Sequence, residues 1–213
     1  MIGQIVSKKR VADHGEVFTG QREVNAMLDL VKHETQRIDS RFLEPACGTG
    51  NFLAEILNRK IDVLDSRYRN SQIELERYTL LAASSIYGID LLEDNVVECR
   101  RRLLEIVENK FPDMLSDDQL KSVRFVFGRN IIHGDALSLK TVGEHPHPIV
   151  FSEWSLVNGS MVKRRDFEFH ELLSFAGIKE KPLFSDLGEE AYFPEPVHDY
   201  PLTHYLKLAD AEG

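Results

Sequence analysis

The sequence predicts an α/β fold built around a doubly wound, mostly parallel sheet, and three observations lead to this prediction. In Phe42–Leu53 (FLEPACGTGNFL), an apolar run breaks into a glycine-bearing turn and resumes as a helix. A second apolar run, Ile86–Asp90 (IYGID), ends in a carboxylate, and a third, Asn130–Leu137 (NIIHGDAL), ends in a turn. Segments with helical spacing separate the three runs, and such alternation favours parallel strands joined by helical crossovers.

Each element follows from its local pattern. Glu23–Thr35 places Val24, Met27, Leu28 and Val31 at helical spacing, which predicts an amphipathic helix. Phe125–Phe127 is either a strand or the end of a helix. The other expected elements are a strand at Arg41–Glu44, a helix at Asn51–Leu64 capped by Asn51, a polar break at Arg67–Arg69, a helix at Glu74–Ser85, a strand at Ile86–Asp90, a helix at Asn95–Lys110 ending before Pro112, and a strand with its exit turn at Asn130–Leu137.

The character of the chain changes after Leu139, and we divide it into residues 1–143 and residues 144–213. Two β-prone runs surround Asn158-Gly159, and Asn-Gly between such runs is the strongest short-range signal for a hairpin. Prolines recur after Lys181, so this tail cannot form a regular helix. Its aromatic residues indicate that it packs on its own domain or on a partner.

Composition limits where the protein acts and what it binds. No segment approaches the roughly 20 apolar residues of a membrane helix, and the N-terminus lacks the apolar core of a signal peptide. The only cysteines, Cys47 and Cys99, lack the spacing of a metal site and are too few for a disulfide framework. We therefore expect a cytoplasmic protein without a membrane or metal partner.

The net charge of -9 argues against a chain that grips DNA alone, because such chains usually show a basic face. Basic residues cluster only locally, and short runs of this kind are typical of a solvated surface. The runs are Lys8–Arg10, Arg100–Arg102 and Lys163–Arg165.

The glycine turn indicates the kind of ligand. Gly48 and Gly50 lack the Cβ atoms that would keep a ligand away from the backbone, and N–H groups at a strand-to-helix turn are expected to point into the crevice. Glu44 would repel a triphosphate and favours a ligand with an amino or sulfonium cation. The turn also lacks the Gly-Lys-Ser/Thr ending of a phosphate-binding loop. S-adenosylmethionine fits this charge pattern best.

Other side chains suit the remaining parts of such a ligand. Asp90, at the end of the second strand, is placed to accept hydrogen bonds from ribose hydroxyls; the alternative is that it caps the next helix. Asp135 is placed to accept a hydrogen bond from an adenine amino group; the alternative is a turn residue. Phe18 offers an aromatic face to a sulfonium or an adenine, and the Thr19 hydroxyl either caps the first helix or binds a carboxylate.

The segments HGEVFT, LEPACGTGNFL, YGIDL and HGDAL occur in this order. Over roughly residues 13–140 the chain resembles a DNA N6-adenine methyltransferase, of the kind found in modification subunits of type I restriction systems and in fused restriction-modification enzymes. LEPACGTGNFL is the specific signal, and the other segments support it. The resemblance implies a class I, Rossmann-like methyltransferase fold and a cofactor site made of Phe18, Thr19, Glu44, Ala46, Cys47, Gly48, Gly50, Asp90, Leu91, Asp135 and Ala136.

In the same resemblance, Phe18 and Thr19 contact the methionine portion of the cofactor, and Glu44 with the backbone of Ala46–Gly48 lines its amino-acid end. Asp90 then holds the ribose and Asp135 the adenine.

The chain departs from this family at the catalytic motif. The family carries an Asn/Asp-Pro-Pro-Tyr/Phe tetrapeptide after strand four, which binds the amino group of an extruded adenine and stacks on the base. This chain has no adjacent prolines. Ser152-Glu153-Trp154 offers polar atoms and an aromatic ring, but it lies inside the expected hairpin, where Trp154 suits a packing role. The catalytic residues are therefore left unassigned.

Three interpretations stay open. In the first, the chain is the cofactor-binding part of a split DNA adenine-N6 methyltransferase. A partner protein then supplies the catalytic motif and target recognition, DNA is bound through the complex, and the chain alone is inactive. In the second, it is a non-catalytic regulatory or scaffold subunit with a methyltransferase fold. In the third, it methylates something other than DNA. The chain could also be a fragment of a longer enzyme.

Overall fold

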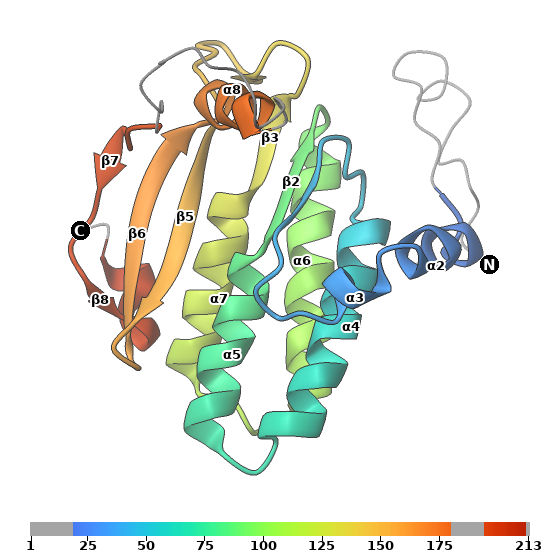
Figure 1. The fold of residues 1–213 in the computed structure, drawn as a ribbon, viewed down its shortest axis with the longest axis vertical. Coiled ribbons are helices and arrows are strands. Elements are labelled where there is room, and N and C mark those ends of the chain that lie inside the picture. Colours follow the sequence, from blue (N-terminus) through green and yellow to red (C-terminus); the bar gives the residue numbers. More distant parts are fainter. Residues whose placement is uncertain (1–18, 180–193, 212–213) are drawn as a thin grey trace.

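The computed structural model describes residues 19–179 and 194–211, which form two small sheets and a layer of long helices (Figure 1). The elements are α2 (Gln21–Asp29), α3 (Lys32–Thr35), β1 (Phe42–Glu44), α4 (Asn51–Tyr68), α5 (Gln72–Ser84), β2 (Ile86–Asp90), α6 (Glu93–Lys110), α7 (Asp117–Asn130), β3 (Ile131–Asp135), β4 (Lys140–Thr141), β5 (Val150–Val157), β6 (Met161–Glu168), α8 (Phe169–Lys179), β7 (His198–Asp199), β8 (Thr203–His204) and the 3-10 helix η1 (Tyr205–Asp210).

The first sheet has the strand order β1-β2-β3-β4. β1, β2 and β3 are parallel, and β4 pairs with β3 in the antiparallel direction. The predicted α/β class and mostly parallel sheet are confirmed. A doubly wound sheet would continue beyond β1 with further strands. Within residues 19–179 and 194–211 no strand pairs with that side of β1, so a doubly wound sheet stays a prediction.

The middle of β2 is shaped for close packing of a helix. A Cβ atom on Gly88 would lie 2.9 Å from Leu53 Cδ1 and 3.0 Å from Cys47 Sγ. Only glycine therefore lets α4 approach this face of the strand. Tyr87 and Ile89, the alternate residues of β2, belong to a separate hydrophobic cluster with Phe151 and other residues of the hairpin region. Helices thus cover one face of β2, and the hairpin region covers the other.

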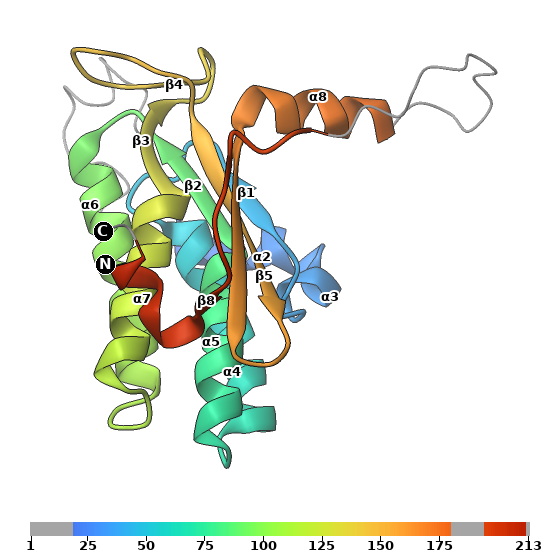
Figure 2. The same ribbon diagram turned by 90° about the vertical axis from the view of Figure 1, so that its left-hand side faces the viewer.

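The predicted hairpin is confirmed. β5 and β6 pair in the antiparallel direction from Val150↔Glu168 to Val157↔Met161, and Asn158 and Gly159 at the turn both have positive φ, 47° and 81°. Figure 2 shows this hairpin standing beside the parallel sheet, with α8 projecting from one end.

The last described segment also packs on the helices. η1 contacts α7, and Tyr205 Oη donates a hydrogen bond of 2.8 Å to Glu76 of α5. One hydrophobic cluster contains Leu53 and Val126 as well as Trp154 and Tyr205. The two parts of the chain therefore share a core, while a domain boundary at residue 143 stays a prediction.

Two local predictions need correction. The first expected helix is broken into α2 and α3 at Leu30 and Val31, which are exposed, whereas Val24 and Leu28 of α2 are buried. The predicted polar break at Arg67–Arg69 is wrong for its first two residues, since α4 continues to Tyr68. Of the two alternatives for Phe125–Phe127, the helix is confirmed: the segment lies near the end of α7, with Phe127 buried in the core. Among all the described helices, none has the length and apolar character needed to cross a membrane.

Candidate functional site

A cavity of about 560 Å³ lies at the carboxyl ends of β1, β2 and β3. Parallel strands bring these ends to one edge of the sheet, where open α/β folds bind ligands. The predicted site residues that line it are Thr19, Glu44, Ala46, Cys47, Gly48, Asp90, Leu91, Asp135 and Ala136. Gly50 lies outside this lining, at the start of α4. Phe18 lies outside the described residues.

The glycine turn has a left-handed backbone at both glycines, and its N–H groups are not oriented as predicted. Gly48 and Gly50 have φ of 52° and 87°. Cys47 N–H donates to Ile89 O (2.9 Å), Gly50 N–H to Cys47 O (2.8 Å), and Gly48 N–H to Asp90 Oδ2 (2.7 Å). The expectation that these groups point into the crevice is therefore wrong for these residues, because two of them bond to β2 and that of Gly50 closes the turn itself.

Asp90 connects three parts of the site. Its side chain accepts hydrogen bonds from Gly48 N–H, from Leu92 N–H (2.9 Å) and from Asn95 Nδ2 (3.0 Å), and the residue is only 9% exposed. Leu92 is itself the N-cap of α6, and no side chain caps that helix, so the alternative capping role of Asp90 is wrong. The bond from Leu92 N–H to Asp90 instead closes a turn between β2 and α6. A carboxylate can accept about four hydrogen bonds, so one acceptor position is left for a ligand hydroxyl. The ribose role stays a prediction.

Asp135 has the geometry of a turn residue, which is the alternative given for it above. Its Oδ1 accepts a hydrogen bond of 2.9 Å from Leu137 N–H. This bond, with a further one from Ser138, lowers the pKa of Asp135. Because its pKa is lowered, the Asp135 carboxylate is ionised at neutral pH where it lines the cavity. The role toward adenine stays a prediction.

Asn51 does not cap α4 as predicted, because the N-cap is Gly50 and no side chain binds there. Asn51 Nδ2 instead donates to Thr19 O (3.0 Å), and its Oδ1 accepts from Arg102 (2.9 Å). These contacts hold the segment before α2 at the mouth of the cavity. Gly20 is the N-cap of α2, which excludes the capping role for the Thr19 hydroxyl.

Glu44, like Asp135, is a half-buried carboxylate that lines the cavity. Burial raises its pKa, and a hydrogen bond from the Ala46 backbone lowers it in part. Because burial disfavours an unpaired carboxylate, a cation bound beside Glu44 would relieve this cost.

Ser152-Glu153-Trp154 lies away from this cavity. Ser152 Oγ donates to Asp166 (2.7 Å), and Glu153 forms ion pairs with Arg41 and Arg165. Trp154 is buried and donates a hydrogen bond of 2.9 Å to Asn130, so its predicted packing role is confirmed. None of the three side chains lines the cavity, so they cannot replace the missing tetrapeptide there.

Further lining residues are absent from the sequence prediction. They are Pro45, Asn51, Phe52, Leu92, Asn95, Gly134 and Leu137. Asn95 could have been predicted from the sequence. It lies on the first turn of α6, just after Asp90, on a face that helical spacing turns toward that carboxylate. Comparison with known proteins adds no family assignment: no family model, no curated protein and no solved structure matches the chain.

Proposed function

We propose that this chain is the S-adenosylmethionine-binding part of a split or partner-dependent DNA adenine-N6 methyltransferase. The observation that carries the proposal is the single cavity lined by three segments distant in sequence, Glu44–Gly48, Asp90–Leu91 and Asp135–Ala136. A volume of about 560 Å³ is within the range of small-molecule sites, roughly 300–1,000 Å³. We also propose that the chain has a class I methyltransferase fold and that a strand of the partner completes the doubly wound sheet.

The residues present fit this cofactor. Glu44 would attract its ammonium or sulfonium cation, Asp90 would accept from a ribose hydroxyl, and Asp135 would accept from the adenine amino group. When bound, S-adenosylmethionine supplies a methyl group already activated by its sulfonium. The task of this chain is then to hold the donor in a fixed orientation, which lowers the entropic part of the barrier.

The acceptor half of the site is proposed to come from a partner protein. The sequence has no Pro-Pro tetrapeptide, and the nearest substitute, Ser152–Trp154, is used for packing and ion pairs. The partner would hold the extruded adenine and recognise the DNA sequence, in agreement with the net charge of -9 on this chain. Neither protein would methylate DNA alone.

One observation favours a second candidate, a non-catalytic subunit. The Asp90 carboxylate accepts three hydrogen bonds from the protein itself, which stabilises the turn without any ligand. A fold that has lost its cofactor and kept its architecture would also show this arrangement.

Calorimetric titration with S-adenosylmethionine separates the two candidates. We expect wild-type protein to bind and Asp90→Ala to bind at least tenfold more weakly, on the order of 1.4 kcal/mol. Asp118→Ala, which removes an exposed carboxylate on α7, is the control and should bind as wild type. Thermal melting of each variant shows whether the fold is kept. Absence of binding by the wild-type chain would contradict a cofactor site formed by this chain alone, and is expected of a non-catalytic subunit or of a pocket that only the partner completes.

The raised pKa of Glu44 gives a pH dependence. A cation is attracted only to the ionised carboxylate, so affinity should fall as the pH drops through this raised pKa, above the usual range of a glutamate. Titrations from about pH 7.5 down to about pH 5 should show the loss in wild type. Glu44→Gln should bind more weakly at neutral pH, with a flatter profile. Equal profiles for the two proteins would exclude Glu44 from the cation site.

A further inference from the structure

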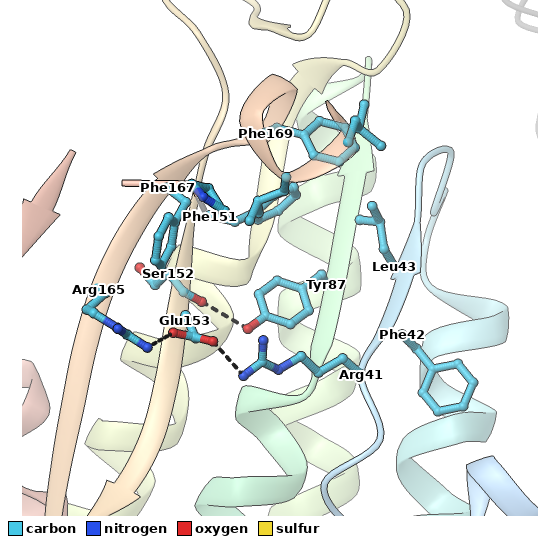
Figure 3. A pocket seen from close by; sticks show the side chains of 13 residues that line it. Arg41, Phe42, Leu43, Tyr87, Phe151, Ser152, Glu153, Arg165, Phe167 and Phe169 are labelled. Atoms are coloured by element: carbon cyan, nitrogen blue, oxygen red, sulfur yellow. Dashed lines mark hydrogen bonds and ion pairs between the residues drawn. The ribbon is translucent and has the colours of Figure 1, made fainter. Parts of the chain in front are cut away.

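A second cavity, of about 580 Å³, lies on the opposite face of the sheet from α4, between β1, β2 and the hairpin (Figure 3). We call it the β1–β5 groove. Its wall is largely aromatic and aliphatic, and its lining includes Leu43, Tyr87, Phe151, Phe167, Phe169 and Leu172. Figure 3 shows Leu43 directed toward this wall, whereas Phe42 points away from it. Leu43 is 40% exposed, so the apolar surface of β1 is incompletely covered by the described residues.

Two unpaired strand edges border the groove. In the described part of the chain, β1 pairs only with β2, and β5 pairs only with β6. Phe42 N–H donates to Ser85 O (2.9 Å), so the alternate residue Leu43 directs its backbone N–H and C=O to the free edge. Ser152 O accepts from Tyr87 Oη (2.9 Å), which shows that the outer edge of β5 faces β2.

The polar end of the groove carries excess positive charge. The Glu153 carboxylate lies between two guanidinium groups, 3.0 Å from Arg41 and 2.5 Å from Arg165. Among the residues that the structure describes, Glu153 is the one carboxylate that pairs with either arginine, so it balances one of the two cations. The arginine side chains are 55% and 41% exposed, so a further carboxylate can reach them from outside. Although the chain has a net charge of -9, this end of the groove is positively charged, which favours an acidic ligand group.

We propose that the β1–β5 groove binds an extended segment of the partner protein, which lies along the free edge of β1. Doubly wound sheets place their next strand beside strand one, at the edge that is free here. Peptides that add to a sheet edge gain affinity from main-chain hydrogen bonds and specificity from pockets for alternate side chains. The segment would place apolar side chains against Leu43 and Phe151, and an acidic side chain beside Arg41 and Arg165.

This inference rests on the proposed function only for the existence of a partner. It adds the place on this chain where that partner docks. The arrangement would place the partner next to the carboxyl end of β1, where Glu44 lines the first cavity. The acceptor adenine could then be presented at the open side of the cofactor site.

Selection of peptides on the full chain tests the groove without knowledge of the partner. A displayed library of twelve-residue peptides is selected, and the enriched sequences are synthesised and titrated. We expect alternating apolar residues with an acidic residue near one end. Leu43→Asp and Arg165→Gln should each weaken binding at least tenfold, whereas Val97→Asp, at an exposed apolar position on α6, should not. The Leu43 amide should exchange more slowly with solvent when peptide is bound.

Several results would overturn the inference. Failure to enrich peptides, or equal binding by wild type and Arg165→Gln, would exclude the groove as a partner site. Binding of decanoate with the same dependence on Arg165, but no peptide binding, would make it a small-molecule site. Peptides that resemble residues 180–193 would assign the groove to the chain's own segment.

Titration of Arg165→Gln with S-adenosylmethionine keeps the two proposals separate. This variant should bind the cofactor as wild type does, because Arg165 does not line the first cavity. Peptide binding without cofactor binding would contradict the proposed function alone. Cofactor binding without peptide binding would contradict only the docking site.

Discussion

Replacement of Gly50 by alanine is expected to lower the free energy of unfolding by about 2–5 kcal/mol. The left-handed backbone at φ 87° costs an L-residue roughly 1–2 kcal/mol. The new Cβ would lie 2.6 Å from Cys99 Sγ, and overpacking of this kind costs roughly 1–3 kcal/mol more. Cys99 is fully buried in the core, so it cannot move aside freely. Urea denaturation of the variant measures the loss.

Gly159→Ala is the matched control. Gly159 has nearly the same backbone conformation, φ 81°, but a Cβ there would meet no atom within 4 Å. The loss in free energy of unfolding should therefore come from the left-handed backbone alone, about 1–2 kcal/mol. Similar losses for both variants would show that the contact with Cys99 is unimportant. We also expect Gly50→Ala to lose binding of S-adenosylmethionine, because the turn must shift to accommodate the methyl group.

Replacement of Lys60 by methionine is expected to lower the free energy of unfolding by about 2–4 kcal/mol. Lys60 is fully buried, and its Nζ donates to Ile38 O (3.1 Å), Ser40 O (2.5 Å) and Ser85 Oγ (2.5 Å). These bonds tie the segment before β1 to the turn before β2. Methionine fills the same volume but leaves buried acceptors without a donor, at roughly 1–3 kcal/mol each, partly offset because no charge is buried.

Lys60 also gives the wild-type protein a distinctive pH profile. Burial lowers the pKa of Lys60 to about 7. Above that pH the folded state has released the proton while the unfolded state still binds it, up to its ordinary pKa near 10.4. Stability contributed by this site therefore rises with pH between these values. The difference in unfolding free energy between wild type and Lys60→Met should grow from about pH 7 to about pH 10. A difference that shrinks would contradict the assigned pKa.

Local pattern was sufficient for the parallel strands. Each is a short apolar run closed by a turn, and the observed bounds of β1, β2 and β3 lie within the predicted segments. The gathering of Glu44, Asp90 and Asp135 at one edge follows from parallel pairing alone. No local signal reveals that the buried part of the first helix's apolar stripe ends at Leu28, because burial there depends on distant elements.

The position of the hairpin and the inside of the site depend on long-range packing. The Asn158-Gly159 turn predicts that β5 and β6 pair, but not that they lie over β2 instead of beside β1. Hydrogen bonding of Gly48 to Asp90 depends on how the turn docks on β2. Lysine is almost never fully buried, so no pattern would place Lys60 in the core.

The free edge of β1 has a consequence for solubility. An unpaired strand edge is a template on which a second molecule can aggregate, and proteins limit this with short edge strands, charged side chains and prolines. β1 has only three residues, it is preceded by the charged Arg41, and it is followed by Pro45, which has no N–H to donate. Repeated copies of this chain therefore find too few consecutive backbone groups to stack into a fibre. A specific segment that also fits the adjacent side-chain pockets would be admitted, so the same three residues can resist aggregation and accept one partner.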